Sequence, residues 1–479
     1  THILTMKKSI SLLLLSLLMI APSCQKTKEA ANEYNIVPKP NQILPQEGRF
    51  ELNSKVSLVI PSDAPEVKGI ADSLAERLKQ TAGISLKEAE SADGKSAICF
   101  VVQEGMPKEG YKLSVTPSLI TLTASQPNGF FYGVQTLYQL LPPAVYGNQL
   151  DKKANWSVPA VEIEDSPRFV HRGLMLDVCR HYVPIDYIYK FIDLLAMNKM
   201  NVFHWHLVDG GGWRMEVKKY PLLVQETAYR TQSSWDRWWM DKDRHYAHKA
   251  DKGAYGGYYT QEDIKEVVRY AAERHIEVLP EIELPGHSDE VCFAYPELSC
   301  AKKPYVNSDL CVGNEATYVF AENVLKEVMD LFPSKFIHIG GDEADRSAWE
   351  KCPLCQQKMQ EHKLKNTAEL QSYFTHRIEL FLNKHGRTLM GWDEIVEGKL
   401  APNAGVMSWR GEQNGIEAAQ LGHPVVMTPV SYCYIDMYQD APMKEPKAQG
   451  GIIPLRKIYS YDPLPLTLRG TEGEKSILG

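Results

Sequence analysis

An aspartate and a glutamate stand next to each other at Asp342-Glu343, directly after Gly340 and Gly341. A carboxylic acid can donate a proton to a leaving oxygen, and the hydrolysis of a glycosidic bond needs such an acid beside that bond. We expect ionised Asp342 to raise the pKa of Glu343 and to favour its protonated form. Carboxylates also favour helix N-termini, so a capping role is the alternative. The two glycines, which allow close approach by a ligand, favour the catalytic interpretation.

Polar and aromatic groups also follow the other apolar, strand-like segments of the chain. Carboxylates, an arginine and several tryptophans together suit a carbohydrate, because sugar C–H faces stack on indole rings while hydroxyl groups need polar partners. Seven segments that end in this way are hard to produce by accident. The groups are Asp177, Arg180, His181, Tyr182, His204, Trp205, His206, Asp209, Glu281, Glu283, His287, Asp342, Glu343, Trp392, Asp393, Glu394, Trp409, Arg410, Tyr434 and Asp436.

The elements that must position these groups alternate between short strands and helices from about residue 168 onward. Strand, helix, strand repeated in this way specifies a parallel sheet, and seven repeats predict a TIM-type (β/α)8 barrel with its active site at the carboxyl ends of the strands. The chain reaches Gly479 without an eighth strand, so we expect the barrel to lack its last strand. The predicted strands are 174–178, 202–207, 276–281, 336–340, 387–391, 405–408 and 424–428, and the clearest helices are 185–198, 261–275, 315–331 and 364–384.

A small α/β domain is predicted before the barrel, over residues 34–155, which leaves 156–479 for the barrel. Apolar runs and alternating patterns indicate strands and a hairpin, and helical spacing indicates two helices between them. The predicted strands are 56–60, 97–102, 111–115 and 119–123, and the predicted helices are 66–81 and 129–141.

Residues 168–438 resemble glycoside hydrolase family 20, the β-N-acetylhexosaminidases, and the residues before 155 resemble the small domain that precedes the barrel in that family. The Gly-Gly-Asp-Glu sequence is the most specific part of the resemblance. It implies a hydrolase of terminal β-linked GlcNAc or GalNAc that needs no metal or organic cofactor. The motifs are Arg180-His181-Tyr182, His-Trp-His-Leu-Val-Asp at 204–209, Pro-Glu-Ile-Glu-Leu-Pro-Gly-His at 280–287, His-Ile-Gly-Gly-Asp-Glu at 338–343, Gly-Trp-Asp-Glu at 391–394 and Tyr-Ile-Asp at 434–436.

By this resemblance the mechanism is retaining and substrate-assisted, and the 2-acetamido oxygen of the sugar attacks the anomeric carbon to give an oxazolinium-like intermediate. Glu343 would protonate the leaving oxygen and then activate water as a base. Asp342 would hold the acetamido N–H, and Tyr434 would donate to the acetamido oxygen. The other implied roles are Arg180 and Asp209 on the sugar hydroxyls, Trp392 and Trp409 as walls of the acetamido pocket, His287 with Glu283 as a pair that orients the acid region, and Asp436 at the C6 hydroxyl or behind Tyr434.

Two features depart from the family's pattern. The family commonly has a second acidic residue after the position of Asp209, whereas Gly210-Gly211-Gly212 follows here, so we expect a looser loop. The family also supplies a tryptophan and an acidic residue from strand eight, and nothing after Tyr459 matches that pair. We interpret the second departure as a truncated reading frame, and we expect exposed flanks on strands 1 and 7.

The beginning of the chain predicts export. Residues 1–5 precede Met6-Lys7-Lys8 and are interpreted as upstream of the start. A basic start and an apolar run too short to span a bilayer comfortably indicate a signal peptide through residue 23. The sequence Ala21-Pro22-Ser23-Cys24 resembles a bacterial lipobox, which implies cleavage before Cys24 and acylation of its thiol; a plain secretory signal with an incidental cysteine is the alternative. Residues 24–33 are polar and predict a tether. We expect a periplasmic or outer-membrane lipoprotein whose lipid is its only contact with the membrane.

Charge and composition limit the partners. The net charge is -7, and no block of Lys and Arg is present, so the sequence offers no footprint for nucleic acid. The expected partner is an oligosaccharide or a glycoconjugate.

The sequence gives little sign of a metal site. Cys352-Pro-Leu-Cys355 is a single CxxC without a second ligand pair, so a local disulfide or two free thiols is favoured over zinc. Cys300 and Cys311 bracket a polar loop that a disulfide could join after export. The alternating pair His204 and His206 has no third ligand at helical spacing, so buried, hydrogen-bonded histidines are favoured over a metal pair.

Two other functions compete with the hexosaminidase. A catalytically silent glycan-binding lipoprotein on the same scaffold would need the acid or its partner to be replaced, and both residues are present. A hydrolase of the same fold that releases a disaccharide would differ in pocket depth, which the long loop 231–257 would set. In that loop Trp235, Trp238 and Trp239 form either an extra sugar platform or simple loop packing.

Overall fold

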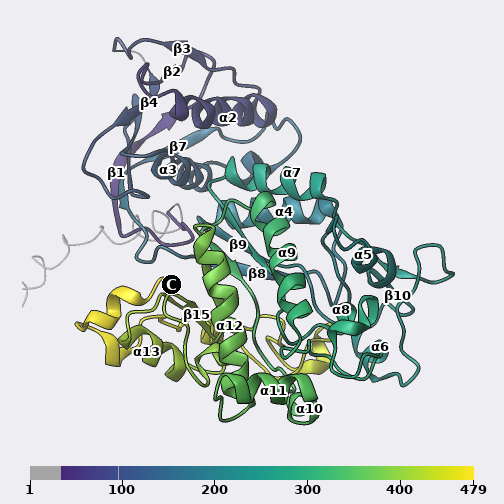
Figure 1. Ribbon diagram of the computed structural model, residues 1–479. Helices are drawn as coiled ribbons and strands as arrows, with labels where there is room; N and C mark the ends of the chain where they lie inside the picture. The colour runs from purple at the N-terminus through teal and green to yellow at the C-terminus, as the bar shows by residue number, and fades with distance from the viewer. Residues whose placement is uncertain (1–33, 95) are drawn as a thin grey trace, which may run out of the picture. The chain divides into compact units, whose positions relative to one another are not determined.

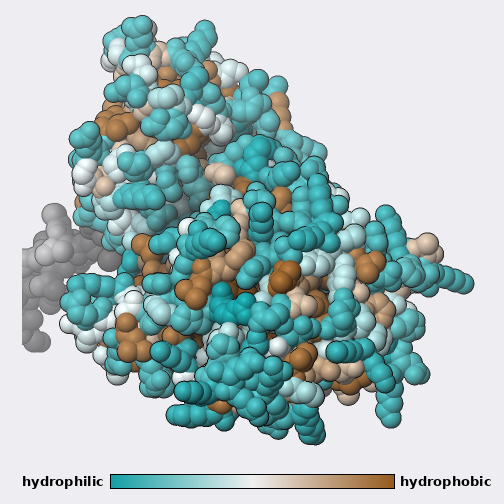
Figure 2. Space-filling model, in the orientation of Figure 1, coloured by the Kyte–Doolittle hydropathy of each residue, from teal (hydrophilic) through white to brown (hydrophobic). Residues whose placement is uncertain are grey.

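Residues 34–94 and 96–479 are described by a computed structural model, in which they divide into two units between Pro167 and Arg168. The predicted signal peptide, the tether and Cys24 lie outside the described residues. Within the described part, none of the helices combines the length and the apolar character that crossing a membrane requires. Figure 2 shows a largely polar face on which apolar residues form small, separate groups.

The first unit is a seven-stranded mixed sheet with two α-helices, in the strand order β1-β7-β5-β6-β4-β2-β3. Strands β6, β4, β2 and β3 are parallel to one another, whereas β1, β7 and β5 pair antiparallel. The predicted strands, hairpin and helices are confirmed; β1, β3 and β7 were not predicted. The elements are β1 (Gln42–Glu51), β2 (Ser57–Val59), α2 (Pro65–Ala82), β3 (Lys87–Ala89), β4 (Ala97–Val102), β5 (Tyr111–Val115), β6 (Leu119–Ala124), α3 (Pro127–Leu140), η1 (Pro143–Tyr146) and β7 (Ser157–Asp165).

The boundary between the units lies later than the predicted division at residue 155. Strand β7 runs between β1 and β5, and its residue Val161 lies opposite Pro45 on one side and Val115 on the other. Its apolar side chains, including Val158 and Ile163, are buried in the core of the first unit. A strand that is hydrogen-bonded on both edges belongs to the sheet that it joins, so the segment through Asp165 is part of the first unit.

The second unit is a curled parallel sheet of seven strands in the order β8-β9-β12-β13-β14-β15-β16, as predicted for the barrel. Helices α4, α7, α9 and α12 follow one another along its outside (Figure 1). The elements of the sheet and its covering helices are β8 (Gly173–Asp177), α4 (Ile185–Met197), β9 (Val202–His206), α7 (Gln261–Ala272), β12 (Glu277–Glu281), α9 (Glu315–Leu331), β13 (Phe336–His338), α12 (Thr367–Lys384), β14 (Thr388–Trp392), β15 (Gly405–Ser408), α13 (Gln413–Gln420) and β16 (Val425–Met427).

The connections of the second unit hold further short elements. The segment between β9 and α7 is the longest connection between consecutive strands and helices of the barrel. The elements of the connections are α5 (Leu222–Thr227), β10 (Tyr229–Arg230), α6 (Trp235–Met240), β11 (Tyr255–Gly256), α8 (Asp289–Ala294), η2 (Pro296–Leu298), α10 (Ser347–Lys351), α11 (Pro353–Glu361), η3 (Asp393–Val396), α14 (Val430–Cys433), η4 (Pro442–Lys444), α15 (Leu455–Tyr459), η5 (Leu466–Leu468) and η6 (Glu472–Ser476).

The last residues of the chain pair with the sheet beyond β16. Backbone hydrogen bonds of 2.8–2.9 Å join Leu478 and Gly479 to Val425 and Met427 on one side and to His171, just before β8, on the other. These residues lie where the next parallel strand of a barrel would run. Strand β8 is half-buried, with Met175 38% exposed, whereas every residue of β9 is buried. This difference agrees with the predicted exposed flank of strand 1. The predicted exposed flank of strand 7 was wrong, because every residue of β16 is buried and the end of the chain pairs with it.

Candidate active site

Asp342 and Glu343 follow β13 at the carboxyl end of the sheet, on a turn with an unusual backbone. The φ angles are +66° at Gly340, +93° at Gly341 and +45° at Glu343. Glycine adopts this left-handed region freely, whereas a glutamate does so at a cost of order 1–3 kcal/mol. A Cβ at Gly340 would also lie 1.8 Å from Oε2 of Glu283. The glycines therefore permit both the turn that presents the acid pair and its packing over Glu283.

His287 joins the acid pair to Asp209. Its Nε2 lies 3.2 Å from Oδ2 of Asp342 and 3.4 Å from Oε2 of Glu343, and its Nδ1 lies 3.5 Å from Oδ1 of Asp209. Burial lowers the pKa of His287, but the three carboxylates outweigh burial and hold this pKa well above its usual value. The imidazolium, on the connection after β12, is therefore the positive charge around which three carboxylates from the ends of β9 and β13 gather.

The pKa of Glu343 is lowered, whereas the sequence predicts that Asp342 raises it. The main cause is the contact with His287, which outweighs the opposing effect of burial on a side chain that is 59% exposed. That expectation was wrong because the sequence does not show the imidazolium between the two carboxylates. A ligand that displaces water from Glu343 would shift this pKa upward.

Glu283 lies beneath the turn that carries Asp342 and Glu343. The predicted pair of Glu283 with His287 is not among the ion pairs of the described residues. Glu283 is 1% exposed, and within the described residues neither of its carboxyl oxygens has a hydrogen-bond partner. Burial first, and then the charges of Asp342 and Glu281, raise the pKa of Glu283 well above its usual value. A neutral carboxylic acid therefore supports the turn from below, and Asp209 takes the place beside His287 that was predicted for Glu283.

Arg180 follows β8, and two carboxylates fix the position of its guanidinium group. Its Nη2 lies 2.7 Å from Oδ2 of Asp209, and its Nη1 donates to Oδ2 of Asp177 at 2.9 Å. Burial opposes the ionisation of Asp177, but the charges of Arg180 and His206 still lower its pKa. The Arg180 side chain keeps 28% of its surface exposed, so a ligand can reach a guanidinium that is already positioned.

The glycine loop 210–212 is tightly held and not loose as predicted. The hydroxyl of Tyr246 donates to the carbonyl of Gly210 at 2.8 Å, and the buried guanidinium groups of Arg214 and Arg230 donate to the carbonyl of Gly211 at 3.2 and 3.1 Å. The N–H of Gly210 donates to Oδ1 of Asp209 at 2.6 Å. The position of Asp209 is therefore well defined without a second acidic residue after it.

A buried ionic cluster centred on Glu281 lies in the barrel interior. Oε2 of Glu281 lies 2.7 Å from His204 and 2.7 Å from His206, and Oε1 lies 3.2 Å from His338 and accepts the indole N–H of Trp392 at 2.6 Å. Burial lowers the pKa of His206, but Glu281 and then Asp209 raise it to about 10. The strand histidines are therefore buried beside a carboxylate.

Aromatic residues form one side of the site. Trp392 is 7% exposed and belongs to the barrel core, against which Trp409 also packs. The indole N–H of Trp409 donates to Oε2 of Glu394 at 3.0 Å, and its ring stacks on Tyr434 at 6.1 Å between centroids. Burial and then the charge of Asp342 raise the pKa of Tyr434, so its hydroxyl remains a donor. Asp436, whose pKa burial raises, lies in the electrostatic field of Asp177 and Arg180.

Known protein families and solved structures match this chain along nearly its whole length. Residues 169–479 match the catalytic domain of glycosyl hydrolase family 20, and residues 33–166 match domain 2 of the same family. The chain belongs to glycosyl hydrolase family 20. This finding confirms the resemblance that the motifs predicted, for the barrel and for the domain before it.

Relatives of this family 20 chain include two bacterial β-hexosaminidases. The chain is 42% identical over 469 residues to that of Porphyromonas gingivalis, with 94% of this chain and 58% of that protein covered. It is 34% identical over 458 residues to that of Vibrio furnissii, with 93% and 71% covered. Its structure is similar to that of the family 20 exo β-N-acetylglucosaminidase from Vibrio harveyi in complex with N-acetylglucosamine, with a TM-score of 0.79, 30% identity and coverage of 93% and 68%. The chain thus spans 58% of the length of the Porphyromonas relative.

The tryptophan-rich loop of this family 20 barrel is packed from within by one tryptophan, whereas a sugar platform stays a prediction. Trp238 is 1% exposed and packs the loop from within. Trp235 stacks on Trp239 at 5.0 Å between centroids, and the guanidinium carbon of Arg180 lies 5.9 Å from the centre of the Trp235 ring. Trp235 is therefore placed at the rim beside the residue expected to hold the sugar.

One cysteine group contradicts the argument against a metal site. The CxxC of Cys352 and Cys355 does have a second pair, because Cys300 and Cys311 lie against it. The pair was not evident from the sequence because about forty residues separate it from the CxxC.

The two buried glutamates of the Pro-Glu-Ile-Glu sequence should respond differently to replacement by glutamine, because Glu281 is charged and Glu283 is neutral. Glu281→Gln removes the nearer of the two carboxylates of protonated His206 and should destabilise the second unit by about 3–5 kcal/mol. Glu283→Gln replaces a neutral acid, so it should match the parent protein near pH 4, where the unfolded chain also holds this proton. As the pH rises, folded Glu283 retains a proton that the unfolded chain releases, and the stability of the parent protein falls. Glu283→Gln should therefore be the more stable protein at about pH 8.

Urea unfolding of both variants and of the parent protein at the two pH values measures these differences. Equal losses in both variants would contradict the assignment of a charged Glu281 and a neutral Glu283.

Proposed function

We propose that this chain is an exo-acting β-N-acetylhexosaminidase that removes terminal β-linked GlcNAc or GalNAc from glycans with retention of configuration. Family membership and the names of the relatives support the reaction class. The observation that carries the proposal is Oδ1 of Asp342, which is buried and has no hydrogen-bond partner within the described residues. An acceptor held in this way beside an acid suits an N–H of the ligand, which the 2-acetamido group supplies.

The first step breaks the bond between the anomeric carbon and the leaving oxygen. The acetamido oxygen forms a bond to the anomeric carbon while Glu343 gives its proton to the leaving oxygen. Asp342 accepts the acetamido N–H and stabilises the positive charge that develops on the oxazolinium. The protonated hydroxyl of Tyr434 orients the acetamido oxygen. In the second step Glu343 takes a proton from water, whose oxygen bonds to the anomeric carbon, and the acetamido group is restored.

The protonation of Glu343 is tied to the binding of substrate in this scheme. In the free site His287 lowers the pKa of Glu343 and favours the carboxylate. A sugar that covers the exposed side chain removes water and favours the protonated acid that the first step needs. After departure of the leaving group, water regains access and the carboxylate can act as the base.

The residues around Arg180 support recognition of a chain end. A guanidinium held by Asp177 and Asp209 presents fixed donors for two adjacent hydroxyl groups of a terminal sugar. Trp235 lies over Arg180 and offers an aromatic face at the rim. These contacts favour binding of a terminal residue over threading of a polymer.

Glu343→Gln should reduce turnover of glycosides with poor leaving groups by about 10²–10⁴-fold, because they need a proton on the leaving oxygen. Aryl glycosides with activated leaving groups need little acid help and should lose much less. Rates of a natural disaccharide and of a nitrophenyl β-N-acetylglucosaminide, measured on the same preparations, test this. Equal losses on both substrates would show that Glu343 is not the acid. If the folded parent protein binds N-acetylglucosamine but hydrolyses neither substrate, the silent glycan-binding lipoprotein is the better description.

Asp342→Asn should lower kcat on 2-acetamido substrates by about 10²–10³-fold, because the amide no longer stabilises the charged intermediate. Asp345→Asn is the matched control, since Asp345 is exposed on the same turn and accepts only from Ser347 among the contacts described. Single-turnover and steady-state rates of both variants separate chemistry from binding. A normal rate in Asp342→Asn would rule out the substrate-assisted mechanism.

We also propose that the chain is exported and anchored through Cys24, on the support of the basic start, the apolar run and the Ala-Pro-Ser-Cys sequence. A Cys24→Ser variant produced in a bacterial host should lose the acyl mass on its N-terminus and move from the detergent phase to the aqueous phase. Intact-mass measurement and detergent partitioning of both proteins check this. An unacylated parent protein would favour a plain secretory signal with an incidental cysteine.

A further inference from the structure

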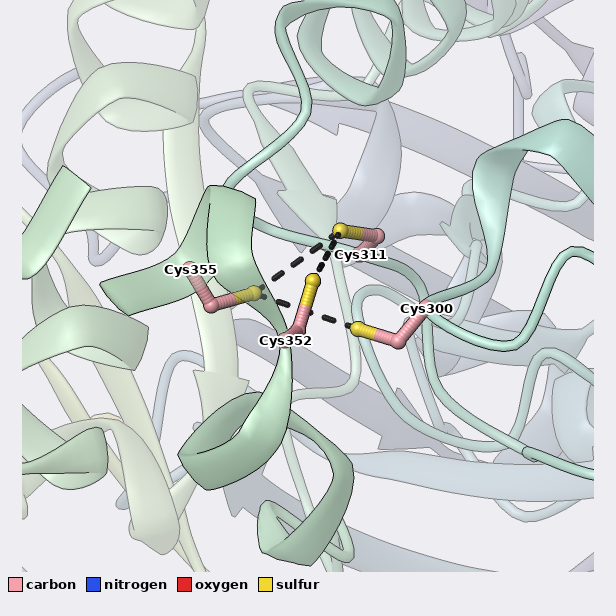
Figure 3. Close-up of side chains that lie close together, drawn as sticks. All are labelled: Cys300, Cys311, Cys352 and Cys355. Carbon is pink, nitrogen blue, oxygen red and sulfur yellow. Dashed lines mark hydrogen bonds between the residues drawn. The ribbon is translucent and has the colours of Figure 1, made fainter. Parts of the chain in front are cut away.

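Four cysteines from two barrel connections point their sulfurs toward a common centre (Figure 3). Cys300 and Cys311 lie on the connection that follows β12, and Cys352 and Cys355 lie at the start of α11 on the connection that follows β13. All four sulfurs are within 4.8 Å of one another. The side chains of Cys311, Cys352 and Cys355 are buried, and that of Cys300 is half-buried.

The separations between the sulfurs fit a single tetrahedral ion. Three of the six separations are 3.6 Å for Cys311 and Cys352, 3.7 Å for Cys311 and Cys355, and 3.9 Å for Cys300 and Cys355, and the other three are within 4.8 Å. Four sulfurs at about 2.3 Å from a central Zn²⁺ in tetrahedral geometry are about 3.8 Å apart. The measured separations therefore scatter around the value that a Zn(Cys)4 centre requires.

Two disulfides are the competing arrangement, and the geometry does not select them. A disulfide places its sulfurs about 2.05 Å apart, so every measured pair would have to close by well over an ångström. Cys311 is also nearly equidistant from Cys352 and Cys355, so no pairing is preferred. Four sulfurs gathered around one common centre are expected of a metal site and not of two separate disulfide bonds.

Contacts of the surrounding backbone also bring the two connections together. Ser299 and Leu310 pair as an antiparallel bridge that brings the two ends of the first loop together. The indole N–H of buried Trp349 donates to the carbonyl of Leu310 at 3.0 Å and so joins α10 to that loop. A Cβ at Gly313 would lie 2.2 Å from the backbone nitrogen of Cys355, so only glycine permits this approach of the loop to α11.

We propose that Cys300, Cys311, Cys352 and Cys355 form a structural zinc site that joins the connections after β12 and β13. Thiolate sulfur selects soft or borderline cations, and a closed set of four cysteines is typical of structural zinc. The first connection carries His287 and the second carries Asp342 and Glu343, so the ion fixes the distance between the two loops that meet at the acid pair. The site stands on the fold of these loops and does not depend on the proposed reaction.

Metal analysis of the full chain, purified without chelators and without added reductant, tests the proposal. We expect one zinc per chain, released by a mercurial thiol reagent. Protein grown with cobalt in place of zinc should show thiolate-to-cobalt charge transfer and the intense visible bands of tetrahedral Co²⁺. The double variant Cys352→Ser/Cys355→Ser should lose the metal and melt at a lower temperature. Cys99→Ser, which changes a half-buried cysteine of the first unit, should keep one zinc per chain.

Three results would overturn the zinc site. One is a folded parent protein without metal whose mass is lower by four hydrogens, as two disulfides require. Another is cobalt-grown, folded protein that lacks the thiolate bands, a measurement that does not depend on the folding of any variant. The third is a double variant that keeps the full zinc content. Hydrolysis of aryl glycosides by the parent protein is measured separately, so failure of the zinc site and failure of the proposed activity are distinguishable.

Discussion

The imidazolium of His287 is the interaction on which the rest of the site depends. It lies within 3.5 Å of carboxyl oxygens of Asp209, which follows β9, and of Asp342 and Glu343, which both follow β13. Three carboxylates at such distances would repel one another without a cation between them. The positive charge thus makes the cluster possible and at the same time lowers the pKa of Glu343. Through Asp209 the same chain of charges reaches Arg180, so the acid and the residue expected to hold the sugar are parts of one network.

Burial gives the neighbouring carboxyl groups different charges although their sequence context is similar. Glu281 and Glu283 are two residues apart, and both are almost fully buried. Glu281 faces three histidines and remains ionised, whereas Glu283 faces Asp342 and no hydrogen-bond partner within the described residues, and remains protonated. Two buried carboxylates with no cation for the second would be far less stable. The proton on Glu283 therefore allows the charged network above it to form.

The sequence predicted the fold class, the barrel strands and most of the site, because these follow from local periodicity and from the rule that barrel strands end at one face. It did not predict β7, since a proline within the strand and alternating acidic residues obscure the apolar pattern. It named His287 but with the wrong partner, and it missed the roles of the buried Arg214 and of the four cysteines. Each of these depends on contacts between loops from different strands, and loop-to-loop geometry is not encoded in the period of any one segment.

Contacts between loops also determine how accurately the side chains of the site are positioned. The barrel brings the strand ends to one face, but a strand end alone does not fix a side chain. Buried Arg214 and Arg230 bind carbonyls of the connection after β9, and Trp349 joins the connections after β12 and β13. A turn with φ of +45° at Glu343 persists only where its surroundings determine it. Contacts between the loops hold this turn in place. The strained Glu343 is therefore held by the neighbouring loops at least as much as by β13, which carries it.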